Sequence, residues 1–336
     1  MEKILLVTLG DPAGVGAEVS LKAALSKELG EAKIVFLGDK SILIETLSLL
    51  NCKAQINAIE EPKDAQFQEG VINLINVTDT PSFEKCKPTA QGGAACARYI
   101  ERAVDIIQKG RAYALITAPI SKEALKMAKI DYPGHTEMLA ALTNTSNYAM
   151  MLCADPIRVI LVTIHKALKE VPNLIKIDNV LQTIRLAGKA CDMLEIKSPK
   201  IAVCGLNPHA GEAGMFGDEE INHISPAINK AKSEGLSAVG PLPPDTVFHR
   251  AYSGEFDIVV CMYHDQGLIP LKMIGFDRGV NVTVGLPIIR TSPDHGTAYD
   301  IAWRGIANEK SMIEAIKLAQ RFKNINSITI IRDRRR

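Results

Sequence analysis

The feature that most constrains the fold is a repeated alternation along the chain. Short apolar runs rich in β-branched residues end in a Gly/Pro or polar turn, and a stretch with helical spacing follows. Examples are ILLVTLG before AEVSLKAALSKEL, and KIAVCGLNPHAGE before EEINHISPAINKAK. This alternation is typical of βαβ units and of a mainly parallel sheet that is covered on both faces. We therefore predict an α/β protein, a three-layer α/β/α sandwich, and its 336 residues favour two lobes.

Charge and composition exclude several classes of protein. Lys plus Arg number 39 against 38 Asp plus Glu, so the chain has no large positive charge that would attract nucleic acid. No stretch approaches the roughly 20 apolar residues of a membrane helix, so no membrane partner is expected. The seven cysteines form no C-x-x-C pair, and several stand inside apolar runs. They are interpreted as buried thiols in a reducing compartment, and a cytoplasmic protein is predicted.

Three histidines stand where apolar runs end. His165 closes RVILVTIH, His209 follows IAVCGLNP, and His264 follows DIVVCMY. Ligands of open α/β sheets bind beyond the carboxyl ends of strands, and parallel neighbours would bring these residues to one edge. A lone histidine at such a place is more often a satisfied structural residue, but three at equivalent places favour a joint metal site. Imidazole ligands favour Zn²⁺, Co²⁺, Ni²⁺ or Mn²⁺ over Mg²⁺.

Two aspartates accompany these histidines. Asp265 follows His264 directly, and Asp245 stands in GPLPPDTVF. Either carboxylate would orient a ligating imidazole ring. For Asp245 an Asx-type turn after the prolines is an equally good interpretation. Three histidines and an aspartate also describe a hydrolytic zinc site, so a metal hydrolase and a noncatalytic binding protein remain alternatives to an oxidoreductase.

A second group of residues predicts a pocket for an anion. In DYPGHTEMLAALT, His135 and Thr136 precede helical spacing, with Thr136 as a plausible N-cap at a helix end that favours anions. Lys272, Asn281 and Arg290 follow in a Gly-rich stretch, with Arg290 at the end of GLPIIR. A guanidinium there would grip a carboxylate or phosphate with two parallel hydrogen bonds. An anionic small molecule is therefore the expected ligand.

The Gly-rich turn GDPAGVG at residues 10–16 follows the first apolar run. It is neither G-x-G-x-x-G nor a P-loop with its Lys and Ser/Thr. We interpret it as a strand-to-helix turn that borders the cleft, and we do not place NAD there.

Taken together, GDPAGVG, YPGHTE, GLNPHAGEAGMFGDEE, GPLPPDT, MYHDQG and GVNVTVGLPIIRTSPDHGTA closely resemble the 4-hydroxythreonine-4-phosphate dehydrogenase family of pyridoxal phosphate biosynthesis, over residues 1–319. The resemblance implies a two-lobed fold like that of isocitrate and isopropylmalate dehydrogenases. It implies a discontinuous first lobe, 1–125 plus 285–336, on the cofactor side. A second lobe, 126–284, would carry the metal ligands and the dimer interface, with the active site in the cleft between the lobes.

The resemblance also implies roles for single residues, carried over motif by motif. It implies a homodimer with shared active sites, and NAD and a divalent metal as cofactors. The metal ligands would be His165, His209 and His264; the substrate contacts His135, Thr136, Lys272, Asn281 and Arg290; the NAD contacts His295 and Gly296, in a stretch similar to the adenosine-side loop of isopropylmalate dehydrogenases. Lys272, Asp245 and Asp265 are the candidates for acid–base work.

The expected reaction is NAD-dependent oxidation and decarboxylation of a 4-phosphorylated 3-hydroxy acid. The favoured substrate is 4-hydroxy-L-threonine 4-phosphate. Three segments, YPGHTEMLAALTNTSNYAMML, HKALKEVP and DIAWRGIANEKSM, look more like a branch that acts on D-threonate or D-erythronate 4-phosphate. These substrates differ at C2, where one has an amine and the others a hydroxyl, so the branch is kept as an alternative.

Overall fold

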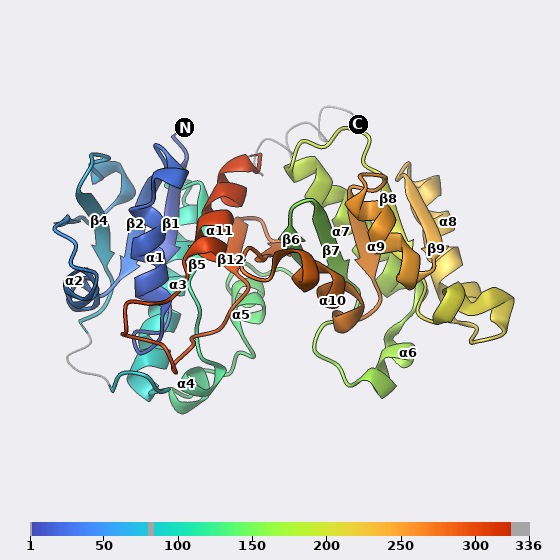
Figure 1. The fold of residues 1–336 in the computed structure, drawn as a ribbon, viewed down its shortest axis with the longest axis horizontal. Coiled ribbons are helices and arrows are strands. Elements are labelled where there is room, and N and C mark those ends of the chain that lie inside the picture. Colours follow the sequence, from blue (N-terminus) through green and yellow to red (C-terminus); the bar gives the residue numbers. More distant parts are fainter. Residues whose placement is uncertain (1, 80–83, 324–336) are drawn as a thin grey trace. The chain divides into compact units, whose positions relative to one another are not determined.

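A computed structural model describes residues 2–79 and 84–323 of the chain (Figure 1). The chain divides into two compact units, each crossed by its own set of strands. Of the described residues, unit 1 comprises 2–79, 84–146 and 286–321, and unit 2 comprises 147–285 with Phe322 and Lys323. Unit 1 is therefore discontinuous in sequence.

Unit 1 contains a fully parallel set of strands in the order β3-β4-β2-β1-β5-β12. Its strands are β1 (Ile4–Thr8), β2 (Lys33–Gly38), β3 (Gln55–Ala58), β4 (Val71–Asn76), β5 (Ala114–Thr117) and β12 (Ile289–Pro293). Its helices are α1 (Gly16–Ala24), α2 (Lys40–Leu49), α3 (Ala90–Gln108), α4 (Lys122–Met127), α5 (His135–Leu142) and α11 (Lys310–Arg321).

Helices cover both faces of these strands. On one face α1 packs against α2 and α11, and on the other α3 packs against α4 and α5 (Figure 1). All residues of β1, β5 and β12 are buried. Burial on both faces explains why these strands are apolar throughout and do not alternate between apolar and polar residues.

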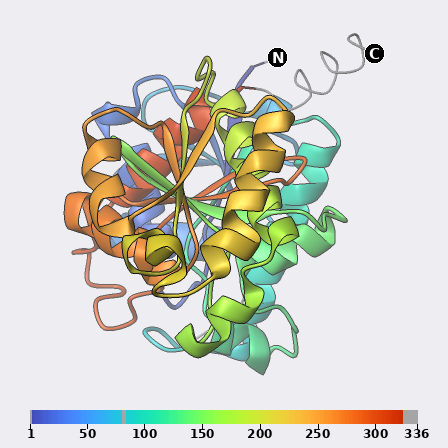
Figure 2. The ribbon, with the colours of Figure 1, turned by 90° about the vertical axis from the view of Figure 1, so that its right-hand side faces the viewer.

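Unit 2 has the strand order β11-β6-β7-β10-β8-β9. Its strands are β6 (Ala149–Ala154), β7 (Ile157–Leu161), β8 (Ile201–Cys204), β9 (Ala238–Leu242), β10 (Ile258–Cys261) and β11 (Val280–Val284), and its helices are α6 (Val171–Leu174), α7 (Ile177–Met193), α8 (Ser225–Ser233), α9 (Pro244–Tyr252) and α10 (His264–Gly275). β6 runs antiparallel to both neighbours, and β7, β10, β8 and β9 are parallel. In Figure 2, α9 and α10 lie on one side of these strands and α7 and α8 on the other.

The predicted α/β class, with sheet strands between two layers of helices, is confirmed. The units divide at residues 146/147 and 285/286, whereas the expected second lobe began at 126. The difference arises because α5 packs against α3 and so belongs with unit 1. Phe322 and Lys323 group with unit 2, where the Lys323 amide donates to the Met193 carbonyl at 2.8 Å. The rest of the expected first lobe, residues 324–336, lies outside the described residues.

Candidate active site

Four neighbouring parallel strands of unit 2 end at one edge, in the order β7-β10-β8-β9. The segments that leave them carry, in the same order, His165, His264, His209 and Asp245. Sites of open α/β sheets lie beyond such strand ends. The strand order therefore places all four predicted residues at one edge, which sequence alone does not establish.

His165 and His264 lie side by side at this edge. Their ring centroids are 5.6 Å apart, and the rings are tilted by 39° to each other. Two imidazoles that bind one ion at about 2.1 Å each would have centroids about 5 Å apart. The spacing of the pair thus fits a shared metal ion.

His264 has a carboxylate beside it that fixes its ring. Its Nδ1 atom lies 2.7 Å from Oδ1 of Asp265, in the first turn of α10. A carboxylate on one ring nitrogen orients the ring and leaves the other nitrogen for a ligand. Asp245 is exposed in the first turn of α9, and its side chain does not cap that helix. The geometry therefore favours Asp265 as the residue that orients the His264 ring.

His209 lies in an unusual backbone segment. Residues 209–213 all have positive φ, including His209 at 52° and Glu212 at 43°, so the chain makes a left-handed turn. Each non-glycine residue in this conformation costs about 1–2 kcal/mol, and such strain tends to gather at functional sites. The His209 ring lies near Phe216, with centroids 6.3 Å apart. Over the described ranges 2–79 and 84–323, the protein gathers no group of three His, Cys, Asp or Glu side chains able to hold a metal. His209 as third ligand stays a prediction.

The left-handed turn is held by a buried carboxylate. Glu220 accepts hydrogen bonds from the amides of Leu206 and Asn207, at 2.7 and 2.8 Å, and from the side chain of Asn207 at 3.0 Å. A Cβ atom on Gly211 would come within 2.7 Å of the Glu220 carboxylate. Only glycine therefore lets the turn close against Glu220.

One glutamine ties the histidine-bearing segments together. Gln266 is buried in α10; its Oε1 atom accepts from the Met262 amide at 2.7 Å, and its Nε2 atom donates to the Gly205 carbonyl at 2.8 Å. Thr163 Oγ1 donates to the Met262 carbonyl at 2.7 Å. The bonds of Gln266 and Thr163 thus connect the ends of β7, β10 and β8, just before His165, His264 and His209.

In unit 1 a buried arginine is the second residue of β12, and its side chain reaches Thr117, the last residue of β5. Arg290 is 2% exposed, and its Nε and Nη2 atoms both donate to Thr117 Oγ1, at 3.1 and 2.7 Å. Burial lowers the pKa of Arg290 to about 9, and the charge of Glu137 opposes that shift. The guanidinium is still charged at neutral pH. A buried cation of this kind attracts an anionic ligand.

The α5 helix begins next to this cation. The N-cap residue is Gly134, so the prediction of Thr136 as N-cap is wrong; Thr136 is the second residue of the helix and is buried. No side chain caps the helix, which leaves first-turn amides for a ligand. Burial, and then the charge of Arg290, lower the pKa of His135 well below its usual range. His135 is therefore a neutral imidazole near Arg290.

Three of the residues predicted to contact substrate or cofactor carry buried polar atoms without a hydrogen-bond partner among the described residues. They are Nε2 of His135, Oδ1 of Asn281 and Nε2 of His295. An unsatisfied buried polar atom costs about 1–3 kcal/mol, so each calls for an explanation. In each unit, a bound polar ligand would give such an atom a partner.

Lys272 and His295 are half-buried, and Gly296 is exposed. Lys272 is in α10, with its ammonium 5.8 Å from the Phe276 ring centroid. His295 follows β12, with Nδ1 at 3.0 Å from the Gly296 carbonyl oxygen. A Cβ added to Gly296 would meet nothing within 4 Å, so the space beside this residue is open.

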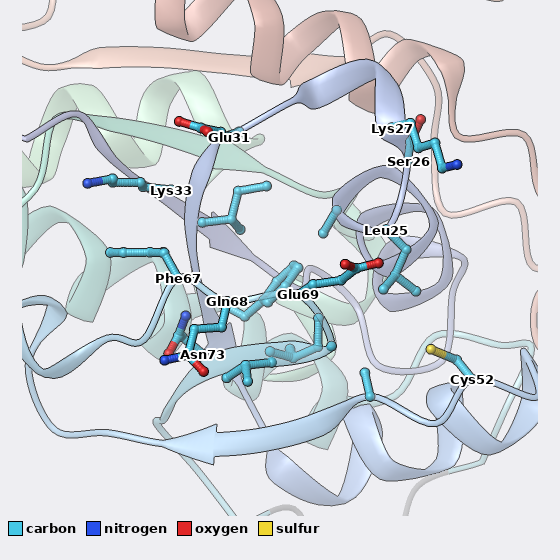
Figure 3. Close-up of a pocket in the computed structure, with 18 of the residues that line it drawn as sticks. Leu25, Ser26, Lys27, Glu31, Lys33, Cys52, Phe67, Gln68, Glu69 and Asn73 are labelled. Carbon is cyan, nitrogen blue, oxygen red and sulfur yellow. The ribbon is translucent and has the colours of Figure 1, made fainter.

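A separate cavity of about 850 Å³ lies elsewhere in unit 1 (Figure 3). Its lining includes the first residues of β2 and β4, Lys33 and Val71, together with Lys27, Phe67 and Glu69. It therefore lies at the amino ends of parallel strands, opposite the edge where open α/β sheets bind ligands. None of the predicted site residues lines it.

Sequence reasoning missed the residues that hold the site in place. Thr117, Glu220 and Gln266 are buried side chains that act through hydrogen bonds, which no spacing rule reveals. Gln266 had a weak signal, because a polar residue follows His264 and Asp265 directly at the start of a helix.

The chain is similar to known proteins over most of its length. The family model described as pyridoxal phosphate biosynthetic protein PdxA matches residues 30–319. A D-threonate 4-phosphate dehydrogenase of Pectobacterium atrosepticum is 46% identical over 95% of this chain and 99% of its own length. A 4-hydroxythreonine-4-phosphate dehydrogenase of Desulfosudis oleivorans is 45% identical over 93% of this chain and 94% of its own.

A solved structure of similar fold carries the same kind of name. The 4-hydroxythreonine-4-phosphate dehydrogenase of Klebsiella pneumoniae superposes with a TM-score of 0.89 and 42% identity, covering 95% of this chain and 99% of that one. The fold and the relatives define the chain as a dehydrogenase, so the hydrolase and the noncatalytic alternatives lose their support. It belongs to the PdxA family of pyridoxal phosphate biosynthetic proteins. No helix within the described residues is long and apolar enough to span a membrane.

Proposed function

We propose that the chain catalyses the NAD-dependent and divalent-metal-dependent oxidation and decarboxylation of a 4-phosphorylated 3-hydroxy acid. The observation that carries this proposal is the buried Arg290 beside the uncapped start of α5. His135, whose pKa is lowered by burial and by the charge of Arg290, lies there as a neutral imidazole. These groups bind a doubly charged anion better than a neutral ligand, because a fixed guanidinium and free helix amides both stabilise negative charge. Arg290, His135 and Thr136 would bind one anionic end of the substrate, and Lys272 and Asn281 are proposed for the rest.

The histidine edge of unit 2 is proposed to hold the metal. His165 and His264 have the spacing of two ligands of one ion, Asp265 orients the second ring, and His209 is proposed as the third ligand. Imidazole ligation favours Zn²⁺, Co²⁺, Ni²⁺ or Mn²⁺ over Mg²⁺. When bound, such an ion supplies Lewis acidity, which lowers the pKa of an alcohol and stabilises enolate charge.

The protein's own groups supply orientation and proton transfer. Asp265 is occupied by His264, so Lys272 and Asp245 are the proposed general bases that take the proton from the C3 hydroxyl. His295 and Gly296 are the proposed contacts of NAD, which, when bound, would supply the acceptor for the hydride of C3. Loss of CO₂ from the resulting β-keto acid completes the reaction. The anion pocket keeps the substrate in one orientation through both steps.

A homodimer with shared active sites is part of the proposal. Ile269, Met273 and Phe276 lie on one face of α10 and its end, and they are 60%, 83% and 79% exposed. Large apolar side chains exposed together mark an interaction surface. This stripe begins in the helix that starts with His264, so a second copy seated on it would approach the histidine edge. A cytoplasmic location is also proposed, because the seven cysteines are all free.

The relatives support two substrates. The favoured one is 4-hydroxy-L-threonine 4-phosphate and the second is D-threonate 4-phosphate, since relatives named for each are 45–46% identical to the chain. D-erythronate 4-phosphate stays a candidate from the sequence motifs alone. A panel of these three compounds, assayed with NAD⁺ and Zn²⁺, Co²⁺ or Mn²⁺, separates the candidates by kcat/KM. Reduced nicotinamide is followed by absorbance and CO₂ by trapping.

Arg290→Lys provides the matched test of the anion pocket. The variant keeps the positive charge but cannot form the two parallel hydrogen bonds of a guanidinium. Loss of one charge-assisted hydrogen bond corresponds to about tenfold or more in affinity, so KM should rise by that factor. Arg250→Lys, at an exposed surface pair with Glu255, is the control and should leave KM unchanged. Absence of nicotinamide reduction with every compound in the panel would reject the proposal.

A further inference from the structure

The segment 294–308, which is all but the last residue of the connection between β12 and α11, has no helix or strand. Irregular connections of this length are uncommon in compact domains and are usually functional. It contains His295 and Gly296, the proposed cofactor contacts, and it also contains Trp303, the one tryptophan of the chain. What holds such a segment in place therefore bears on the reaction.

The Gly-rich turn at residues 10–16 holds it. The Tyr299 hydroxyl donates to Asp11 Oδ2 at 2.7 Å, and the Trp303 indole donates to the Pro12 carbonyl at 3.1 Å. The Val15 amide donates to the Thr297 carbonyl at 3.0 Å. Three residues of the turn thus each bind a different part of the segment.

The approach is close enough to require glycine. A Cβ atom on Gly14 would lie 2.9 Å from the Thr297 carbonyl oxygen and 3.0 Å from the Thr297 Cβ. Backbone contacts of this kind cannot be relieved by a change of rotamer. The glycine in the turn is therefore explained by the segment that packs on it.

The first turns of α1 extend this contact to the far end of the segment. Glu18 is buried and accepts from the Ala307 amide at 2.7 Å, and Lys22 donates to the carbonyls of Gly305 and Ala307 at 2.9 and 2.8 Å. Glu18 and Lys22 also pair with each other at 2.8 Å. Residues 297–307 are thus hydrogen-bonded to the Gly-rich turn and to α1, while Gly296 borders open space.

Asp11 is the costly element of this arrangement. It is fully buried, and it accepts only from neutral donors, Tyr299 and the Ala13 amide, among the hydrogen bonds of the described residues. Burial raises the pKa of Asp11, and the two hydrogen bonds oppose that shift. A buried carboxylate without a cation destabilises the fold. A role of Asp11 in fixing the position of Tyr299 would account for this cost.

We propose that residues 10–16 form the dock of segment 294–308, and that Asp11, through Tyr299, is a positioning residue that presents His295 and Gly296 to the nicotinamide cofactor. The docking itself follows from contacts within unit 1. The role toward the cofactor rests on the proposed function.

The sole tryptophan makes the docking visible without any substrate. Tyr299→Phe removes the hydroxyl bound to Asp11, and Gly14→Ala pushes Thr297 away without changing a polar group. In both variants of the cofactor-free protein, Trp303 emission should shift to longer wavelength and acrylamide quenching should increase. Tyr252→Phe, at an exposed position, is the matched control and should leave the spectrum unchanged.

The kinetic arm tests the role of the dock toward the cofactor. Both variants should raise KM for NAD⁺ by about tenfold, as for the loss of one hydrogen bond to a charged group, with kcat within about twofold of the unmodified enzyme. Far-UV circular dichroism shows that the variants are folded. Unchanged Trp303 emission in both folded variants would overturn the docking, and changed emission with an unchanged KM for NAD⁺ would overturn the cofactor role. If the unmodified enzyme reduces no NAD⁺ with any compound of the panel, the proposed function fails, and the fluorescence arm still decides the docking.

Discussion

Replacing Gln266 by Met tests whether one buried side chain keeps the histidine-bearing segments in register. Methionine is close to glutamine in volume, so the change removes polar groups and leaves little cavity. It deprives the Met262 amide and the Gly205 carbonyl of their partners, at positions that water does not reach. Each buried group left without a partner costs about 1–3 kcal/mol, so the variant should lose about 2–6 kcal/mol of local stability.

Hydrogen exchange at the Met262 amide measures this loss directly. A local loss of 2 kcal/mol corresponds to exchange about 30-fold faster, and larger losses to more. Gln108→Met, on the exposed end of α3, controls for the substitution itself and should leave exchange at Met262 unchanged. Because His264 and His209 follow the strands that Gln266 connects, the affinity for Co²⁺ should also fall.

Protection of the Met262 amide that matches the unmodified protein would refute this reasoning. It would mean that water or a rearranged side chain replaces the glutamine at little cost. A decrease in Co²⁺ affinity without faster exchange at Met262 would show that Gln266 acts in another way than through these two hydrogen bonds.

Three further outcomes are expected. Thr117→Val removes the oxygen that receives both Arg290 donors, so KM for the phosphorylated substrate should rise about tenfold in steady-state assays. The depressed pKa of His135 means that the unfolded chain binds a proton below about pH 6.5 while the folded chain does not, so the free energy of unfolding should fall by about 1.4 kcal/mol per pH unit as the pH drops through that range. His135→Gln should reduce that slope in urea titrations. A double Lys replacement of Met273 and Phe276 should convert the proposed dimer to monomers in light scattering, and a dimer mass unchanged by the replacement would remove the α10 stripe from the proposed interface.

The fold was largely predictable because both faces of the sheets are covered. Complete burial leaves apolar runs such as Ile4–Thr8 that stand out from helical spacing. The order of strands was not predictable, because no local pattern says that β10 lies between β7 and β8. That order is what sets His264 beside His165.

Local geometry departed from the sequence pattern in the functional segments. The α5 helix begins after Gly134 and not after Thr136, because the helix extends to His135 without a capping side chain. The left-handed turn at His209 contains alanines and glutamate, residues that strongly disfavour positive φ. Glu220 anchors the residues just before this turn through the amides of Leu206 and Asn207, and only a structure reveals such contacts.

The division of unit 1 into two sequence segments affects the order of events on the ribosome. Residues up to 146 emerge before β12 and α11 have been made. The side of β5 that these two elements cover therefore stays exposed while residues 147–285 are synthesised. At about 5–20 residues per second that wait is roughly 7–30 seconds. During that interval His135 has no guanidinium beside it. Until translation passes α11, the nascent chain thus exposes apolar surface and lacks a complete anion pocket. Exposed apolar surface of this kind is what chaperones bind.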